Sequence, residues 1–441
     1  MWGFTIDDAF IPLRYAAQLR RFGAYRFCEG SAPSDGVTPL PLPFLLVPFG
    51  GAPPFAALVT WKALSLVLCV GVALYASRSL KGDAASRLLL GALLVGPLPV
   101  AAHAGAGLET GLVIALGTMA ASMFSVRPTR ALVFAGLASA FRPELIVFSI
   151  SMTLAVAFRD REAARVPRTV ATWVSASLLP FLVCAGARAA AFGAPIPLSA
   201  YAKPASLSQG SVYVLVACLV CATPILGLVS LSRRGTPRLL SLVGFAGCCA
   251  IAMAGGDWMP YGRLVAPLAP VFVFAFSEAE FQGYKGKLPA LLVGLLSVWP
   301  WVTAAPRGRT VLADRAALVL DAQPFLGDRI ASVDIGWPSA TKPDAYIMDL
   351  AGLTDAQIAH LRGSHTSKNV DAGMLLDRHI DTVLLYASTG SSDVPYDGAV
   401  YGRETDYRLA QSELLHAHFE QRAFVRLGRS GSSGYYILRR R

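Results

Sequence analysis

Charge is scarce in this chain. Asp, Glu, Lys and Arg make up 15% of its 441 residues, whereas hydrophobic residues make up 54%, and the mean hydropathy is +0.51. A water-soluble domain ordinarily carries about 25% charged residues. The composition therefore excludes a chain whose whole surface faces water, and most of this one is expected to lie in a lipid bilayer.

The chain also lacks the cysteines for a disulfide framework. Six of its seven cysteines fall in apolar runs and only Cys28 lies outside them. This excludes a small domain held together by disulfides. Cys218 and Cys221 have a CxxC spacing, but within an apolar run we expect them to act as small packing residues.

Apolar runs of about the 20 residues that cross a hydrocarbon core predict about ten membrane spans. They lie near 55–77, 88–104, 107–125, 131–158, 169–191, 211–231, 239–254, 264–281 and 288–305. The run 131–158 is interrupted by Arg142-Pro143-Glu144 and is expected to form two short helices that meet at one face. No cleavable signal peptide and no span precedes Asp7, so we expect either an N-terminal tail that crosses unaided or a further helix upstream.

Alternate loops between these runs are basic. Cytoplasmic loops retain Lys and Arg, so these loops predict one cytoplasmic side. Their basic residues are Arg78, Lys81, Arg87, Arg127, Arg130, Arg159, Arg161, Arg165, Arg168, Arg233, Arg234, Arg238, Lys285 and Lys287. These fourteen cations account for much of the formal net charge of +11, so the charge does not predict a nucleic-acid partner. The other side then carries the remaining loops and everything after about residue 305.

Composition divides the chain into three parts. Residues 1–54 form an outer segment with an amphipathic helix and an apolar stretch suited to the membrane interface, residues 55–305 the transmembrane domain, and residues 306–441 a soluble α/β domain. In the last part, RIASVDIG and DTVLLYA predict strands, LTDAQIAHLR a helix, and FVRLG-RSGSSG-YYILRR a hairpin. The predicted fold is mainly α, a polytopic membrane helix bundle with a small extracytoplasmic α/β domain.

An adjacent carboxylate pair, Asp7-Asp8, opens the amphipathic stretch AFIPLRYAAQLRRF. One reading is that a single Asp caps the helix that begins near Ala9. Capping needs one carboxylate and not two, so we favour a chemical role. Because both residues lie in an outer segment, substitution of either is expected to leave folding intact.

A few ionisable residues lie at the outer ends of the apolar runs. Charge at that depth is unfavourable unless it is paired or faces a wet cavity, so such residues are functional candidates. They are Lys62, Glu109, Arg142, Glu144, Arg188, Lys203, Asp257 and Arg263.

Six short strings contain most of these residues: DDAFIPLRYA (7–16), DGVTPL (35–40), AGLETGL (106–112), FRPEL (141–145), FGAPIPLSAYAK (192–203) and GGDWMPYGR (255–263). In this order and with this topology, they resemble bacterial GT-C glycosyltransferases that use polyprenyl-phosphate sugars, in particular the family of the mycobacterial terminal arabinofuranosyltransferase. The resemblance covers the whole chain, including SVDIG and DLAGLTD near its C-terminal end.

The chain departs from that family in three places. The first transmembrane helix expected before Asp7 is absent, and the DGVTPL segment is shortened and has no Trp. The Asn of the Pro-rich loop is replaced by Leu198 or Ser199. The last two differences bear on which sugar is used.

The resemblance implies an enzyme of the bacterial inner (plasma) membrane, with its active site and C-terminal domain on the extracytoplasmic side. It would transfer a sugar, arabinofuranose or another pentose or hexose, from a polyprenyl-phosphate donor to a hydroxyl of a cell-envelope glycan, with inversion. In families of this kind the acid pair of the first loop hosts the general base, which assigns that role to Asp8 or Asp7.

The remaining candidates fit the other needs of such a transfer. A departing phosphate needs cationic groups, and an Arg fork or a Lys point charge can supply them. The candidates are Arg142, Lys203 and Arg263 for the phosphate, and Glu109, Glu144, Asp257 and Trp258 for the substrate. Asp7 and Asp8 could also recruit a divalent cation, although no third ligand is identifiable by spacing.

Structural roles compete with these assignments. Lys203 and Lys62 could instead snorkel to lipid headgroups, and Arg142 could pair internally with Glu144. Glu109 could orient Arg142, bind a sugar hydroxyl or simply sit favourably at a helix N-terminus. Asp257 and Trp258 could form a turn in an interfacial aromatic belt. His103 is expected to be a packing residue.

Two other classes of function compete with an enzyme. A polytopic transporter or flippase of lipid-linked glycans predicts charges through the bilayer midplane, whereas the middle of each apolar run here is nearly uncharged. A non-catalytic envelope scaffold would not need the acid pair or the one-sided cationic cluster.

Overall fold

The structure is a computed structural model that describes residues 1–281, 283–428 and 431–441. The described residues divide into two compact units. Unit 1 comprises Met1–Trp2, Trp61–Ala187 and Ala205–Gly308, and unit 2 comprises Gly3–Thr60, Arg188–Pro204 and Arg309–Arg441. The N-terminal segment therefore belongs to the same unit as the C-terminal region.

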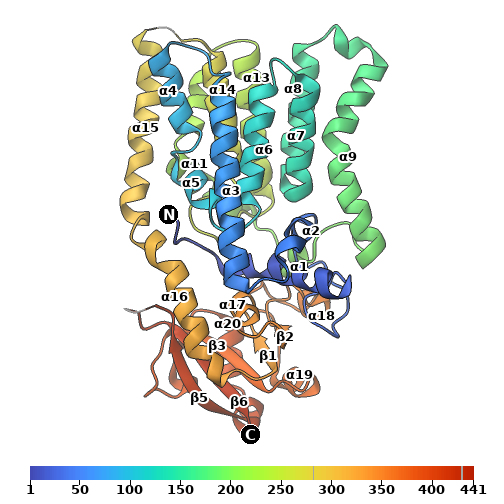
Figure 1. Ribbon diagram of the computed structural model, residues 1–441, viewed down its shortest axis with the longest axis vertical. Helices are drawn as coiled ribbons and strands as arrows, with labels where there is room; N and C mark the ends of the chain where they lie inside the picture. The colour runs from blue at the N-terminus through green and yellow to red at the C-terminus, as the bar shows by residue number, and fades with distance from the viewer. Residues whose placement is uncertain (282, 429–430) are drawn as a thin grey trace. The chain divides into compact units, whose positions relative to one another are not determined.

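Unit 1 is helical, and its helices run side by side as a bundle (Figure 1). They are α3 (Pro54–Ser77), α4 (Ala84–Leu93), α5 (Leu98–Ala104), α6 (Thr110–Met123), α7 (Pro128–Phe141), α8 (Ile146–Arg159), α9 (Pro167–Phe192), α11 (Leu207–Cys221), α12 (Pro224–Ser230), α13 (Thr236–Met253), α14 (Ala269–Glu278) and α15 (Tyr284–Ala304). The first residues of α3 and the last residues of α9 belong to unit 2. The break predicted at Arg142 is confirmed, because a 3-10 turn at Pro143–Leu145 separates α7 from α8.

Four helices of the described chain are long and apolar enough to cross a membrane. They are Pro54–Ser77, Pro167–Phe192, Thr236–Met253 and a segment from Lys287 to Phe325, and two bent pairs, α4 with α5 and α11 with α12, raise the number to six. The protein thus has the character of an integral membrane protein. The count of ten spans is not confirmed, since α6, for example, has only 14 residues.

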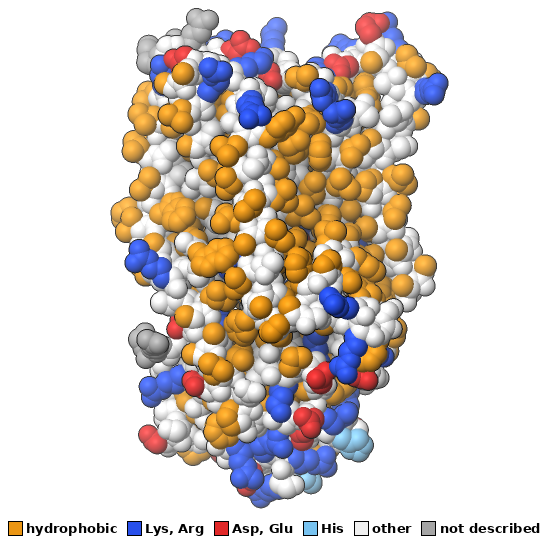
Figure 2. Space-filling model, in the orientation of Figure 1, with side chains coloured by type: hydrophobic (Ala, Val, Ile, Leu, Met, Phe, Trp, Pro, Cys, Tyr) orange, Lys and Arg blue, Asp and Glu red, His pale blue; other side chains and the backbone are white. Residues whose placement is uncertain are grey.

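The basic loops of unit 1 meet at one end of its bundle. Lys81 forms ion pairs with Glu278 (2.9 Å) and Glu280 (2.7 Å), and Arg159 donates to the carbonyl oxygen of Phe124. Figure 2 shows Lys and Arg side chains gathered at this end, at the top of the view, and hydrophobic side chains over the flank of the helices. The loops that the sequence assigned to one face therefore do share one face.

Unit 2 contains a mixed sheet, six-stranded among the described residues, in the order β2-β1-β3-β6-β5 with β4 on the free part of β3. The strands are β1 (Arg329–Ser332), β2 (Tyr346–Asp349), β3 (Thr382–Thr389), β4 (Val400–Tyr401), β5 (Phe419–Arg426) and β6 (Gly434–Arg440). The first three strands are parallel, and β6 is antiparallel to both β3 and β5.

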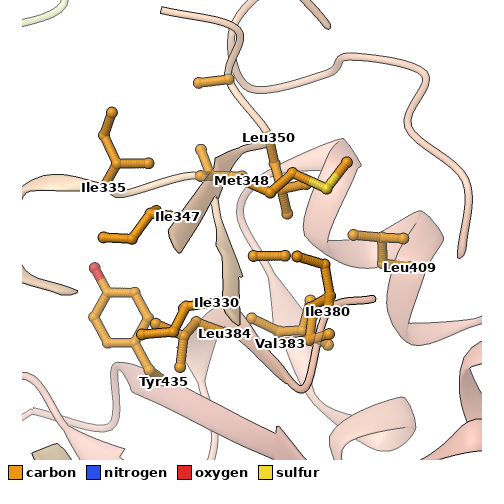
Figure 3. Close-up of a cluster of buried hydrophobic side chains, with 14 of the residues drawn as sticks. Ile330, Ile335, Ile347, Met348, Leu350, Ile380, Val383, Leu384, Leu409 and Tyr435 are labelled. Carbon is orange, nitrogen blue, oxygen red and sulfur yellow. The ribbon is translucent and has the colours of Figure 1, made fainter. Parts of the chain in front are cut away.

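Short helices accompany this sheet. They are α1 (Phe10–Phe22), α2 (Leu42–Leu46), α10 (Leu198–Ala202), α16 (Arg307–Ala322), α17 (Gly336–Thr341), α18 (Ala356–Ala359), α19 (Ala372–Asp377), α20 (Glu404–Ala410) and α21 (Glu413–His418). Buried side chains of the strands and of these helices form one core, part of which Figure 3 shows around Ile330, Val383 and Leu384. Tyr15 of α1 and Val37 are members of that core, which explains why the N-terminal segment belongs to unit 2.

The sequence predicted most of this sheet. The two strands and the hairpin are confirmed as β1, β3 and the pair β5–β6, although residues 429 and 430 of the hairpin turn lie outside the described residues. The helix predicted over LTDAQIAHLR is reduced to the four residues of α18. Its N-cap Asp355 binds the N–H of Ile358, but the helix ends before Leu361, because the chain turns there to bring Lys368 onto the carbonyl oxygens of Ala359 and Leu361.

Candidate functional site

Arg142 lies between two carboxylates in unit 1. It precedes Pro143 and therefore adopts an extended backbone (φ −135°, ψ 96°) that ends α7. Its Nη1 lies 2.8 Å from Oε1 of Glu109, and its Nη2 lies 2.7 Å from Oε1 of Glu144. The side chains of Arg142 and Glu109 are 9% and 3% exposed, so these charge-assisted hydrogen bonds are strong. The structure thus contains both contacts that the sequence suggested for Arg142.

A second ion pair lies in the loop that follows α13. Nε of Arg263 lies 2.7 Å from Oδ2 of Asp257, and both side chains are nearly buried. The loop turns at Gly256, which has φ +71° and whose added Cβ would lie 2.7 Å from Cβ of Tyr213. Only glycine fits this position without strain, so the sequence GGDW places Asp257 against α11.

These two pairs belong to one electrostatic neighbourhood. Asp257 and Tyr213 both interact electrostatically with Arg142. His103 interacts electrostatically with Arg263, Asp257 and Arg142. His103 is completely buried, and its Nε2 lies 3.0 Å from the carbonyl oxygen of Pro260. This burial agrees with a packing role for His103.

A cavity of about 570 Å³ opens beside this neighbourhood, between α11 and the loop 257–262. Its lining includes Tyr213, Asp257, Trp258 and Tyr261. The backbone N–H of Leu264 donates to Oη of Tyr213 over 3.0 Å, which holds that ring in place. Trp258 is 53% exposed. A carboxylate among aromatic rings is an arrangement that suits a sugar ring, whose faces are apolar and whose edges carry hydroxyls.

The two arginines of this cluster differ in how many of their donors face a carboxylate. Glu109, Glu144 and Asp257 supply three carboxylates, and Arg142 and Arg263 supply two guanidinium groups. Arg142 uses both of its terminal nitrogens for carboxylates. Arg263 approaches Asp257 through Nε, and no ion pair of its two terminal NH₂ groups is found among the described residues. Of the two arginines, Arg263 is therefore the better candidate for a phosphate.

Asp7 lies in unit 2 and is used by the fold itself. Its Oδ2 accepts the N–H of Gly336 (2.8 Å), and its Oδ1 accepts the N–H of Trp337 (2.9 Å) at the start of α17. Nη1 of Arg315 lies 3.1 Å from Oδ1. Burial is the largest influence on this carboxyl and raises its pKa to about 6, against the opposing effects of Arg315 and the Gly336 N–H. Asp7 thus caps a helix more than 300 residues away rather than its own.

This arrangement argues against one expectation about Asp7. Its side chain is 4% exposed, and it joins the N-terminal segment to the C-terminal region, so we expect its substitution to destabilise the fold. Asp8 differs, since it is only partly buried. Neither residue occupies the N-cap position of the following helix, which is Ile6 for the turn Asp7–Ala9 and Ala9 for α1.

Lys203 also lies in unit 2, directly after α10, where its N–H closes the last turn on the carbonyl oxygen of Ser199. Its side chain is partly buried. Lys62, in unit 1, is completely buried, and its Nζ lies 5.4 Å from the centre of the Trp2 ring.

Two ionic contacts of unit 2 were not expected from the sequence. Nε of Arg188 lies 2.7 Å from Oδ2 of Asp35, and both side chains are almost fully buried. Arg403 donates to both carboxylate oxygens of Asp334 at 2.9 and 2.8 Å, and Oη of Tyr435 donates to the same carboxylate. Although burial opposes it, Arg403 and Arg315 hold the pKa of Asp334 below its usual value.

A signal for one of these contacts was present in the sequence. Arg188 interrupts an apolar run, and Asp35 belongs to the DGVTPL string. Neither feature names the other as its partner, because 153 residues separate them. For Arg403 and Asp334 no local signal exists, since charged residues are common in the soluble part of the chain.

Metal binding finds no support from a cluster of side chains. Among the residues that the structure describes, no three His, Cys, Asp or Glu side chains gather in a way that could hold a metal ion. Both carboxylate oxygens of Asp7 accept hydrogen bonds from protein donors. The two acids of the first loop therefore do not form a ready pair of metal ligands.

Comparison with protein-family models, with characterised proteins and with solved structures finds no match to this chain.

Proposed function

We propose that this chain is a membrane glycosyltransferase of the GT-C type, which transfers a sugar from a polyprenyl-phosphate donor to a hydroxyl of a cell-envelope glycan. The observation that carries the proposal is the cavity of unit 1, where Asp257, Tyr213 and Trp258 line a space of about 570 Å³ beside a buried cluster of arginines and acids. Its volume lies in the usual range of small-molecule sites.

The distribution of charge favours an enzyme over a transporter. The segments 63–77, 169–187 and 239–253 contain no Asp, Glu, Lys or Arg, and each lies within a helix able to span a membrane. A transport pathway would need polar groups along the middle of such helices. The buried ion pairs occur instead where helices end, at the N-terminus of α6, after α7 and after α13.

Arg263 supplies the contact to the donor phosphate. Its Nε lies 2.7 Å from Oδ2 of Asp257, an ion pair that leaves the outer NH₂ groups for two phosphate oxygens. Positive charge at this position stabilises the phosphate as it leaves. Arg142 and Lys203 are the further cationic candidates, and Glu109 and Glu144 are acceptors for sugar hydroxyls.

Asp8 is the proposed general base. Its carboxylate takes the proton of the acceptor hydroxyl, the acceptor oxygen forms a bond to the anomeric carbon, and the bond from that carbon to the phosphate oxygen breaks. Polyprenyl phosphate departs with the electron pair of that bond. One direct displacement inverts the anomeric centre. The support for choosing Asp8 over Asp7 is that Asp7 is occupied by Arg315, Gly336 and Trp337.

The proposal includes a topology. The end of unit 1 that gathers the basic loops is taken as cytoplasmic, so the opposite end, with Glu109, Arg142 and Asp257, is extracytoplasmic. Unit 2 would lie on that same side of a bacterial inner membrane. About ten spans result when short helices such as α7 and α8 are counted with the longer ones.

The test is release of polyprenyl phosphate by the purified full chain. The protein in detergent is given a panel of polyprenyl-phosphate sugars, including an arabinofuranosyl donor, together with cell-envelope glycan acceptors. Product is followed by mass spectrometry. Asp8→Asn is expected to lower the rate by about 10²–10⁴-fold, and Arg263→Gln by about 10²-fold.

The matched control is Arg234→Gln, which removes an exposed arginine from a basic loop. It should leave the rate unchanged. Full activity of Asp8→Asn would contradict the base assignment, and absence of release with every sugar tried, from a folded protein, would favour the transporter or the scaffold.

A further inference from the structure

Unit 2 contains a second cavity that shares no residue with the site in unit 1. Its volume is about 540 Å³. One face of α1 forms a wall, on which Phe10, Leu13 and Ala17 follow one another at helical spacing. The chain between Phe49 and Ala57 forms the opposite wall, and Asp344 lies at the rim.

A buried amide is left unsatisfied in this cavity. Gln18 lines it and is only 6% exposed. Its Oε1 has no hydrogen-bond partner among the described residues. A buried carbonyl oxygen without a donor is unfavourable. A ligand that offers a hydrogen-bond donor, such as the P–OH of a singly protonated phosphate monoester, would satisfy it.

The neighbouring arginines make the cavity cationic. Arg14 forms the buried part, where its guanidinium donates to the carbonyl oxygens of Phe27 and Ala345. Arg20 donates to the carbonyl oxygen of Pro48 over 3.0 Å and has no ion pair with an acid of the described chain. Asp344 offsets only Arg21, so positive charge is in excess.

The loop beside Arg20 is shaped to receive it. A Cβ added to Gly51 would lie 3.0 Å from Cζ of Arg20, so the guanidinium lies where a side chain at position 51 would crowd it. A guanidinium is a planar fork that can bind a phosphate through two N–H groups.

The rest of the cavity is apolar. Phe10, Phe49, Pro53 and Pro54 contribute most of the walls. On the adjoining helix α2, Phe44 and Leu45 are 54% and 47% exposed, as expected of a segment that lies in a membrane interface. A molecule entering from that interface would bring a hydrocarbon chain as well as a head group.

We propose that this cavity binds a phosphate-headed lipid, with its phosphate on Arg20 and the Gln18 amide and the first part of its hydrocarbon chain along Phe10, Phe49 and Pro54. The site is separate from the donor site in unit 1 and does not rest on the glycosyltransferase function. The chemistry shared by isoprenyl phosphates and phosphatidic acid is a monoester phosphate on a flexible apolar chain, and either can occupy the site.

The experiment is photo-crosslinking of the full chain in detergent with a diazirine-bearing farnesyl phosphate, mapped by mass spectrometry. Labelling of the segment 49–57 is expected. Arg20→Gln and Gln18→Leu should each lower that labelling at least fivefold, and Gly51→Ala, which displaces Arg20 without removing its charge, should lower it about threefold. Arg422→Gln, an exposed arginine of β5 outside the cavity, should have no effect.

Competition identifies the ligand chemistry. Excess unlabelled farnesyl phosphate or dihexanoyl phosphatidic acid should remove the labelling at 49–57, whereas equal amounts of farnesol or inorganic phosphate should not. Full competition by farnesol would overturn the phosphate contact, and full competition by inorganic phosphate would reduce the site to an anion site. Labelling that is absent from 49–57, or unchanged by both Arg20→Gln and Gln18→Leu, would also overturn the proposal.

Discussion

The two units of this protein bury charge in different ways. In unit 1 the buried charged residues belong to a few short sequence segments next to helix ends. They form ion pairs with one another, as Arg142 does with Glu144 two residues away. In unit 2 a buried charge meets a partner far along the chain, as Asp7 meets Arg315 over 308 residues. The same type of interaction therefore marks a candidate site in unit 1 and holds the fold together in unit 2.

The difference arises from the surroundings. Where nearly every neighbour is apolar, a charged residue has few partners, so rarity alone identifies it. In a soluble domain charged residues are ordinary, and only the tertiary fold selects which of them are buried together. Removal of single partners in each unit tests this contrast.

The largest effect is expected from removing a single partner in unit 2. Arg315→Ala leaves Asp7 and the neighbouring Asp334 without one of their cations, so the free energy of unfolding should fall by about 5 kcal/mol. A lower Tm in differential scanning calorimetry would report it. Arg309→Ala, which removes an exposed arginine of the same helix, should leave the Tm unchanged, and equal Tm values for both variants would refute a structural role for the network.

The acids of unit 2 predict that stability falls as pH rises. Burial raises the pKa of Asp406 to about 7 and that of Asp349 and Asp7 to about 6. Between their unfolded pKa near 3.8 and these values, the folded state retains protons that the unfolded state has released. Stability should thus decrease between pH 4 and pH 7 by on the order of 8 kcal/mol. A Tm that rises over this interval would contradict the sign.

A smaller loss is expected from the same type of change in unit 1. Arg142→Ala leaves Glu109 and Glu144 unpaired at a helix end, where water can reach Glu144 in part, and we expect a loss of about 3 kcal/mol. The triple change Arg142→Met, Glu109→Gln and Glu144→Gln removes all three charges and should recover most of the stability. Failure to recover it would show that Arg142 stabilises the helix end through packing.

A substitution at a glycine of unit 1 should disturb its cavity without removing any charged residue. Gly256→Ala places a Cβ close to Tyr213 at a φ of +71°, which should cost about 2 kcal/mol of local strain. The rate of the proposed sugar transfer should fall while the ion pairs of Arg142 remain. Gly71→Ala in α3, where an added Cβ meets nothing within 4 Å, is the control and should retain full activity.

The smallest effect is expected for an exposed pair of unit 2. Arg21 and Asp344 lie 2.7 Å apart, but their side chains are 60% and 81% exposed. Arg21→Gln should therefore change the free energy of unfolding by less than about 1 kcal/mol. A larger loss would mean that exposure is a poor guide to the role of charge in this unit.

Much of the fold followed from periodicity. The apolar runs, the break at Arg142, the strand β3 and the hairpin β5–β6 are each marked by a local pattern of hydrophobic and turn residues, whichever partners the segment later contacts. The long helix predicted over LTDAQIAHLR failed, because Lys368 and the carbonyl oxygens of Ala359 and Leu361 impose a turn that no local pattern reveals. The number of spans remained ambiguous because short apolar helices satisfy composition without the length to cross a bilayer.

The candidate site shows the same division between local sequence patterns and long-range contacts. The strings with Glu109, Arg142 and Asp257 could be identified from the sequence, as could the Arg142–Glu144 pair. The occupation of Asp7 by α17, the pair of Arg188 with Asp35, and the unsatisfied Gln18 could not. Each depends on the approach of segments that are far apart in the chain.

By itself, the sequence determined that this is a membrane protein with its basic loops on one face, because hydropathy and charge act on each segment independently of its partners. Only the tertiary structure decided that residues 3–60 belong with the C-terminal sheet and that Asp7 is a structural acid while Asp8 is only partly buried. Asp7 and Asp8 are neighbours of the same residue type, and they differ in the residues that the fold places around them. Whether a carboxylate caps a helix or is a candidate base depends on the donors that surround it.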